Sequence, residues 1–386
     1  MIYVLVIWFF LALSSFGVLG LNYVYAYFAA KRPWKIRMDK DYLPSVSIIV
    51  PTYNEFETIK YKLRNLKKLS YPKNLVQIVF ADSKSTDSTL EEIRAFAEQH
   101  PDFDTKIIVE DERKGKTSAL NMALRNCTGD VVVVSDADCF WNSTILIDSL
   151  PYLADPSVGA VSGPKRLLNP TDSWVTKNED RYLKSMNLMK LGESKKSSTI
   201  FFEGGFSAYK KGALESFDPY KTGSDDCGSL MSVLEKNLKT IMVPEAEFFT
   251  TFSKDWSERM AIKIRRSGQL IRVLGIYGEH MLRARLKTER KTLAKNLFLY
   301  LLAPVVFLLF LVTTAYFILI FPVAIVMGLV FLVPKINTYV AEVVLNYFII
   351  LYSMILTATR KQFVVWKKPA DRALLTEEML VKAGLI

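Results

Sequence analysis

The sequence predicts an α/β domain built on a mostly parallel sheet and flanked by membrane-spanning helices at both ends. Two apolar stretches indicate the membrane helices, because no charged residue occurs between Met1 and Ala30 or between Asn296 and Pro334. A third observation indicates the α/β domain. Between residues 31 and 295, short apolar runs alternate with amphipathic helical patterns.

The first apolar stretch predicts an uncleaved membrane anchor. A cleaved signal peptide is the alternative, but no Lys or Arg precedes the apolar residues, and no small-residue cleavage site precedes the basic cluster that follows. That cluster contains Lys31, Arg32, Lys35 and Arg37. Because positive residues mark the cytoplasmic end of a membrane helix, we expect the central domain to be cytoplasmic.

Four runs in the central domain read as buried strands, because they are continuously apolar rather than alternating. They are residues 45–50, 76–81, 105–110 and 130–135. Amphipathic helices are expected at 88–100 and 117–126. Strand–helix alternation implies right-handed crossovers, and sheets built in this way bind ligands outside the carboxyl ends of their strands.

Polar residues gather directly after three of the predicted strands. The three segments are PTYNE (51–55), ADSKSTDST (81–89) and SDAD (135–138). Since the carboxyl ends of parallel strands meet at one edge of the sheet, we expect a ligand site there.

Asp136 and Asp138 follow a run of valines. Residues two apart in an extended chain point the same way, so we expect both carboxylates on one side, with Ala137 turned away. Two like charges so close destabilise each other unless a cation lies near them. A divalent ion, Mg²⁺ or Mn²⁺, that also takes phosphate oxygens would relieve this repulsion. A solvated acidic turn is the alternative.

Charge and cysteine content argue against several classes of protein. The net charge of +11 is better explained by anionic lipid heads than by nucleic acid, so no nucleic-acid partner is expected. Cys127, Cys139 and Cys227 lack CxxC spacing and indicate neither a disulfide nor a zinc site. The GKT at 115–117 is not part of a P-loop, because Glu110 stands where that motif requires glycine.

Four segments, in this order and spacing, closely resemble family 2 glycosyltransferases with a GT-A fold. They are VSIIVPTYNE (46–55), ADSKSTDST (81–89), GKTSALNMAL (115–124) and DVVVVSDAD (130–138). The resemblance extends over the central domain and implies a Rossmann-like GT-A sheet. It also implies inverting transfer from a nucleotide-sugar, with a UDP-sugar as the expected donor.

The resemblance implies a role for each residue of the donor side. The residues implied to contact the donor nucleotide are Pro51, Tyr53, Glu55, Asp82, Lys116 and Asp136. Within this set, Asp82 would hydrogen-bond the uracil and Asp136 would meet the ribose and the metal. Asp138 would ligate the Mg²⁺ or Mn²⁺ that bridges the diphosphate. Such a metal stabilises the negative charge that develops on the leaving group.

The second half of the domain resembles the acceptor side of the same family. In FFEGGFSAYKKGAL (201–214), Gly204 and Gly205 would let the backbone approach a sugar closely, and a glycine turn before a helix is the alternative. In GSDDC (223–227), Asp226 matches the catalytic base and Asp225 replaces the usual glutamate. The base takes the proton of the acceptor hydroxyl. The alternative for two acids at a helix start is interaction with the helix dipole.

One motif of the processive relatives is incomplete. At the positions of their Q-x-x-R-W motif this chain has Lys263, Arg266 and Ser267. The missing tryptophan would stack on the acceptor sugar, so its absence argues against synthesis of a long polymer. Arg265 and Arg266 are expected to hold the donor diphosphate, with lipid phosphates as the alternative ligand. Residues 254–274 have helical spacing and are expected in the membrane interface.

The second apolar stretch is much longer than one span of about 20 residues. Two spans with a break within 314–322 are expected, and Val343–Thr359 is a borderline third. If this third segment crosses the membrane, the tail lies outside the cell; if it lies flat or re-enters, the tail stays cytoplasmic. The sequence leaves both options open. The predicted units are an anchor (1–30), a GT-A domain (31–258), amphipathic interface helices (259–295), two or three membrane helices (296–360) and a basic tail (361–386).

The leading hypothesis is a multi-pass enzyme of the cell membrane, an inverting glycosyltransferase acting on a lipid-linked or glycan acceptor. The runner-up is a processive polysaccharide synthase that polymerises and exports a glycan. A catalytically inactive nucleotide-sensing module fits less well, because the acidic set is intact. A nucleotidyltransferase also fits less well, because PTYNE stands where its glycine-rich signature would be.

Overall fold

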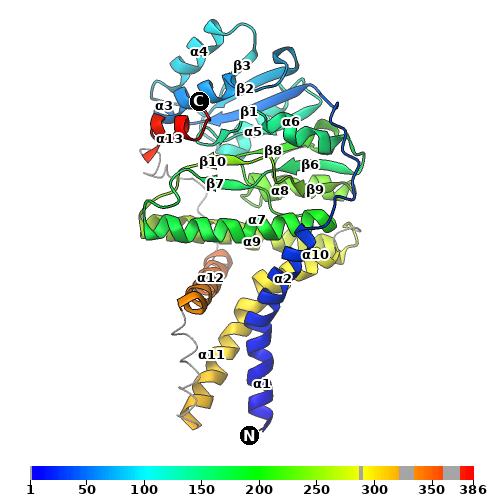
Figure 1. Cartoon of the computed structure of the whole chain (residues 1–386), viewed down its shortest axis with the longest axis vertical. Helices are drawn as coiled ribbons and strands as arrows, with labels where there is room; N and C mark the ends of the chain where they lie inside the picture. Colours follow the sequence, from blue (N-terminus) through cyan, green and yellow to red (C-terminus); the bar gives the residue numbers. More distant parts are fainter. Residues whose placement is uncertain (1, 287–289, 321–333, 360–373) are drawn as a thin grey trace.

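The computed structural model describes residues 2–286, 290–320, 334–359 and 374–386, with backbone alone for 334–338. Figure 1 shows a globular α/β domain above a group of long helices, with the N-terminus at the far end of those helices. The predicted fold class is confirmed. The domain contains one large sheet with helices against it, and apolar helices flank it in the sequence.

The main sheet has seven strands in the order β3-β2-β1-β4-β8-β6-β9. Its strands are β1 (Val46–Thr52), β2 (Val76–Asp82), β3 (Asp104–Val109), β4 (Val131–Val134), β6 (Val158–Ser162), β8 (Ser207–Lys210) and β9 (Lys239–Met242). Strand β8 alone runs antiparallel to its two neighbours, and the other pairs in the sheet are parallel. The four predicted strands are therefore confirmed as β1 to β4. Strands β1, β2 and β4 are almost fully buried, because both faces of the sheet are covered there, whereas the edge strand β3 is partly exposed.

A second, three-stranded sheet lies beside the edge where β4 ends. It has the order β5-β10-β7, with β5 (Phe140–Trp141), β7 (Lys165–Leu167) and β10 (Phe248–Thr250). Strand β5 begins two residues after Asp138. The small sheet therefore fixes the chain directly after the predicted metal-binding residues.

Helices cover the sheet and continue below it. They are α1 (Ile2–Ala12), α2 (Val18–Ala30), α3 (Phe56–Lys67), α4 (Thr89–Gln99), α5 (Lys116–Leu124), α6 (Ile145–Ser149), α7 (Trp174–Lys196), α8 (Asp225–Glu235), α9 (Trp256–Leu282), α10 (Arg290–Leu297), α11 (Ala303–Ile320), α12 (Pro334–Ala358) and α13 (Glu377–Lys382). The helices predicted at 88–100 and 117–126 are confirmed as α4 and α5. Helix α7 was not among the predicted elements.

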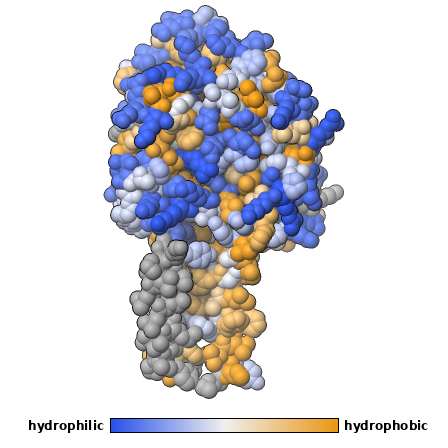
Figure 2. Space-filling model, viewed as in Figure 1, coloured by the Kyte–Doolittle hydropathy of each residue, from blue (hydrophilic) through white to orange (hydrophobic). Residues whose placement is uncertain are grey.

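Three helices in the described part of the chain are long and apolar enough to cross a membrane: Ile2–Ala30, Arg290–Ile320 and Tyr339–Ala358. Large apolar side chains stand exposed on them, and Phe10 is 60% exposed and Leu319 80% exposed. Figure 2 shows hydrophobic surface over these lower helices and mostly hydrophilic surface over the globular domain. Such a band of exposed apolar surface is typical of segments that face lipid.

The break expected within 314–322 is tested only in part by the C-terminal helices. The helix that begins at Arg290 continues to Ile320, so the break expected within 314–322 does not occur before that residue, and residues 321–333 lie outside the described part. The segment Val343–Thr359 falls almost entirely within α12. Beyond it, α13 packs against α3 of the globular domain (Figure 1).

Helices α7 and α9 lie side by side beneath the domain, above the membrane helices (Figure 1). A buried ion network joins them to α12. The Arg259 guanidinium on α9, which is fully buried, contacts Glu179 of α7 at 3.1 Å and Glu342 of α12 at 3.0 Å. Lys263 donates to Glu342 at 2.5 Å. Removing one member of such a network leaves a buried charge unpaired, so the network holds α7 and α9 against α12.

Candidate active site

The nucleoside side of the candidate site is formed by the segment after β1. Pro51 is half-buried within the strand, and the Arg113 guanidinium lies over the Tyr53 ring at 3.8 Å from its centre. Glu55 is buried, and one of its carboxylate oxygens accepts a hydrogen bond from the Thr58 hydroxyl in the first turn of α3. Arg113 was not predicted, although a cation over an aromatic ring is a common platform for a flat ligand.

Asp82, at the end of β2, is fully buried. Its carboxylate accepts hydrogen bonds from the Thr52 hydroxyl at 2.9 Å and from the Ser85 amide and hydroxyl at 2.8 and 2.6 Å. The side chain thus ties the ends of β1 and β2 together.

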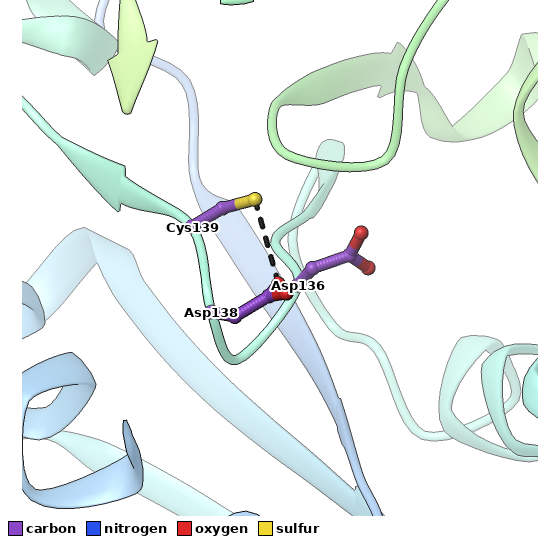
Figure 3. Close-up of side chains that lie close together, drawn as sticks. All are labelled: Asp136, Asp138 and Cys139. Atoms are coloured by element: carbon purple, nitrogen blue, oxygen red, sulfur yellow. Dashed lines mark hydrogen bonds between the residues drawn. The ribbon is translucent and has the colours of Figure 1, made fainter. Parts of the chain in front are cut away.

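The two predicted metal ligands lie in a tight turn after β4. The strand ends at Val134, and the Cys139 amide donates to the Asp136 carbonyl at 3.2 Å, which closes the turn. The expectation that 136–138 continues as extended chain is therefore wrong. The carboxylates nevertheless end on the same side, as Figure 3 shows, and Ala137 is buried as expected. Asp136 begins the turn and Asp138 lies within it, so the turn keeps their carboxylates close together.

These residues suit a hard divalent ion. Ligand atoms of Asp136, Asp138 and Cys139 lie within 4.8 Å of one another. Burial raises the pKa of the Cys139 thiol well above its usual range, so the carboxylate oxygens are the available ligands. Burial and the Asp138 carboxylate also raise the pKa of Asp136, although Lys116 opposes them. Carboxylate oxygens are the ligands that Mg²⁺ and Mn²⁺ prefer, and a cation here would relieve the repulsion.

A buried lysine that was not predicted holds this turn in place through two hydrogen bonds. Lys62 of α3 donates to the Ser135 hydroxyl at 2.5 Å and to the Cys139 carbonyl at 2.7 Å, one partner on each side of the turn. Its ammonium also lies 4.3 Å from the centre of the Trp141 ring. Burial lowers the pKa of Lys62 to about 7. On an amphipathic helix a lysine is usually solvated, so the sequence offered no signal for this contact.

Lys116 joins the donor side of the site to the acceptor side. Its ammonium lies 2.7 Å from Asp136 and 2.7 Å from Asp225, which begins α8. Burial alone would lower the pKa of Lys116, but the carboxylates of Asp136, Asp225 and Asp226 raise it well above its usual value. Lys116 is therefore a fixed positive charge at the centre of an acidic cluster.

The adjacent acids at the start of α8 have different environments. Burial and the charge of Asp225 raise the pKa of Asp226 well above its usual range. Burial also acts to raise the pKa of Asp225, but the Lys116 ammonium outweighs it, so the pKa of Asp225 lies below its usual value. Ser224 caps the helix, since its hydroxyl accepts from the Cys227 amide at 3.3 Å. Two carboxylates whose pKa values are pushed apart are suited to different tasks, one as a proton acceptor and one as a fixed charge.

Gly204 lies where the two halves of the site meet. Its carbonyl accepts from the Asp136 amide at 3.1 Å. A methyl group built on Gly204 would lie 2.7 Å from the Lys116 ammonium, 2.8 Å from an Asp136 oxygen and 3.0 Å from an Asp226 oxygen. The loop leads into strand β8 rather than a helix, so the alternative of a glycine turn before a helix is wrong. A side chain at this position would displace these charged groups, so the close approach of the backbone favours glycine.

Gly204→Ala is expected to lower the rate of the catalysed reaction by about 10²-fold, because displacing the charged groups by a fraction of an ångström misplaces the reacting atoms. The measurement is the initial rate of nucleotide release from the donor. Gly212→Ala is the matched control, since a methyl group there meets no atom within 4 Å. Equal rates for the two variants would contradict the placement of Gly204 in the site.

The two predicted arginines differ in their surroundings. Arg266 lies 4.0 Å from the buried Glu179. Among the described residues, Arg265 makes no hydrogen bond or ion pair, and the nearby charges of Asp225, Asp226 and Asp136 favour its charged form. Burial and the neighbouring Arg266 lower the pKa of Arg265 to about 10. Arg265 is thus the better placed of the two to bind an incoming anion. Lys263, at the motif position of glutamine, is engaged by Glu342 instead.

Comparisons with known proteins agree with this geometry. The sequence model of the family described as Glycosyl transferase family 2 matches residues 47–217. The chain is 30% identical over 220 residues to an N-acetylglucosaminyltransferase of Rhizobium meliloti, covering 53% of this chain and 50% of that one. It is 25% identical over 202 residues to a poly-beta-1,6-N-acetyl-D-glucosamine synthase of Staphylococcus epidermidis. That match covers 50% of this chain and 47% of the synthase. The chain thus spans half or less of the length of these relatives.

One solved structure resembles nearly the whole chain. It is a mannosyltransferase from Pyrobaculum calidifontis, solved in complex with GDP-Man and Mn²⁺. The TM-score is 0.78 at 28% sequence identity, and the match covers 93% of this chain and 100% of that one. The similarity therefore includes helices outside the region matched by the family.

Proposed function

Because the chain contains a glycosyl transferase family 2 domain, we propose that it is a membrane-bound inverting glycosyltransferase. It would move a sugar from a nucleotide-sugar donor to a hydroxyl of a lipid-linked or glycan acceptor. The observation that carries this proposal is the cluster around Gly204. Lys116, Asp136 and Asp226, which come from three separate parts of the sequence, lie around one glycine of the loop before β8. A solvated acidic surface would not require such close packing.

The chemistry follows from the roles of these residues. The acceptor oxygen attacks the anomeric carbon of the donor, and the bond from that carbon to the diphosphate breaks. Asp226 takes the acceptor proton, since its raised pKa makes it the better base of the adjacent pair. Lys116 and Arg265 would supply positive charge toward the departing diphosphate. Asp136 and Asp138 would hold a divalent ion, which supplies further stabilisation of the leaving-group charge when bound.

Two donors are candidates. The sequence resemblance favours a UDP-sugar. The Pyrobaculum mannosyltransferase was solved with GDP-Man, and its likeness over nearly the whole chain makes GDP-mannose the second candidate. In either case Tyr53 and Arg113 offer a platform for the base, and the enclosed Asp82 would contact it after Ser85 moves.

A donor screen tests the proposed function. The purified chain in detergent is given UDP-glucose, UDP-galactose, UDP-N-acetylglucosamine or GDP-mannose, each with Mn²⁺ and a lipid extract. Nucleotide release and labelled lipid are measured together. We expect one donor to release nucleotide at least about 10-fold faster than the others, because pocket contacts discriminate between ligands by roughly this factor or more. Absence of release with every donor would rule out the proposal.

The membrane helices suit an acceptor at the bilayer. Helices α7 and α9 lie between α8, which carries Asp226, and the apolar helices, and this arrangement supports such an acceptor (Figure 1). The basic cluster that begins at Lys31 and Arg32 favours a cytoplasmic domain in the cell membrane. The second candidate function, a processive synthase, is less well supported because Ser267 replaces the tryptophan of the motif. A single discrete glycolipid product would exclude it, and a ladder of products would favour it.

A further inference from the structure

Residues 375–386, which follow the membrane helices in the chain, pack on the globular domain and are called here the docked tail. Leu380 and Leu385 are fully or almost fully buried. They form an apolar cluster with Ile386 and with Phe140 of β5. In Figure 1 the tail lies beside α3, at the opposite end of the molecule from the N-terminus.

The local sequence of the docked tail explains its shape. Thr376 caps α13 by accepting a hydrogen bond from the Met379 amide at 3.3 Å. After the helix, Gly384 adopts a φ of 72°, which glycine tolerates, and the Leu385 amide donates back to the Leu380 carbonyl at 2.9 Å. This turn directs Leu385 and Ile386 toward the domain, so the tail presents one apolar face to it.

A single buried residue joins the docked tail to the active site. Asn65 of α3 is 1% exposed, and its amide nitrogen donates to the Leu385 carbonyl at 2.7 Å and to the Trp141 carbonyl at 2.8 Å. Its amide oxygen accepts from the Trp141 backbone at 2.9 Å. Asn65 therefore pairs with both backbone groups of Trp141 while it holds the tail.

Trp141 in turn touches both loops of the site. It lies three residues after Asp138, and its indole nitrogen donates to the Gly205 carbonyl at 2.7 Å. The preceding residue, Phe140, is covered by the tail. The metal-binding turn and the glycine loop are thus fixed to one tryptophan, and that tryptophan is fixed to the tail.

We propose that the docked tail is a positioning element for the active site. Through Asn65 and Phe140 it holds β5, and through Trp141 it holds both the turn that carries Asp136 and Asp138 and the loop that carries Gly204. The effect on catalysis rests on the function proposed above. Asn65 is a positioning residue, since it reaches the site through Trp141 rather than by touching a ligand.

The test compares the full chain with a variant lacking residues 375–386, both purified in the same detergent. Hydrogen–deuterium exchange is measured for peptides covering 135–141 and 204–205. We expect exchange in these peptides to become about 10-fold faster while β1 to β3 stay unchanged, because opening is local to the contacts that were removed. With the donor found in the screen, we expect kcat/KM to fall by about 10-fold or more. An added peptide of residues 374–386 should restore both values.

Val381→Ala is the matched control, because this side chain is on the same helix and is 54% exposed. If the deleted protein is not recovered, Leu385→Ala replaces it and should accelerate exchange in the same two peptides. Unchanged exchange there would overturn the proposal, as would equal acceleration across β1 to β3, which marks a general loss of stability. Failure of the unmodified chain to release nucleotide would instead count against the proposed function, and the exchange result would still decide the role of the tail.

Discussion

Asp226→Asn is expected to lower sugar transfer by about 10³-fold, because the acceptor proton loses its base while the shape of the site is kept. Asparagine is close in size to aspartate and can still lie near Gly204 and Lys116. The variant should therefore bind the donor with a dissociation constant close to that of the unmodified chain. The measurements are the initial rate of transfer at saturating donor, and donor binding by isothermal titration in the presence of Mn²⁺.

Glu215→Gln is a suitable control for this variant. It removes an acid that lies upstream of α8, is 75% exposed and pairs only with Lys236 among the described residues. Surface changes of this kind have small effects, so activity should stay within about twofold. A general base typically contributes about 10²-fold or more to the rate. If Asp226→Asn kept more than about a tenth of the transfer rate, Asp226 would therefore not be the base.

Asp138→Asn is expected to lower nucleotide release by about 10²–10³-fold at low concentrations of Mn²⁺, because one of two carboxylates suited to the ion is lost. Part of the rate should return at high Mn²⁺, since Asp136 is still present. The measurement is nucleotide release as a function of Mn²⁺ concentration, with half-saturation compared between the variant and the unmodified chain.

The control for this change is Asp130→Asn. Asp130 is exposed and directly precedes β4, at the end of the strand away from the site, and its carboxylate accepts from the Ser45 hydroxyl at 2.6 Å. It should show an unchanged response to Mn²⁺. An equal shift in the two variants would mean that the effect comes from net charge rather than from the turn at Asp138.

Much of the framework could be predicted because it depends on local patterns. A continuous apolar run such as 130–135 has few alternatives to a buried strand, and parallel strands bring their carboxyl ends to one edge. For this reason Asp82 and Asp136 were correctly expected at that edge. Their environments were not predictable. The enclosure of Asp82 by Ser85 and the tight turn after Val134 depend on hydrogen bonds between segments that no periodicity encodes.

The features that were not predicted share one physical cause: they depend on contacts with residues that are distant in the sequence. Lys62 and Asn65 lie on an amphipathic helix where polar residues are usually solvated, yet both are buried because Cys139, Trp141 and Leu385 cover them. Helix α7 has no single apolar face, because it packs against membrane helix α2 as well as the domain. Gly192 of α7, for example, approaches the backbone of Ala26.

We expect the carboxylates at the end of β4 and the start of α8 to act together on one nucleotide-sugar. The most direct measurement of this joint action is nucleotide release by the purified chain in EDTA and after stepwise addition of Mn²⁺, with Asp138→Asn alongside. We expect negligible release in EDTA, full release on adding Mn²⁺, and half-saturation at a higher Mn²⁺ concentration in the variant. Release in EDTA at the full rate, or identical Mn²⁺ curves for the two proteins, would contradict it.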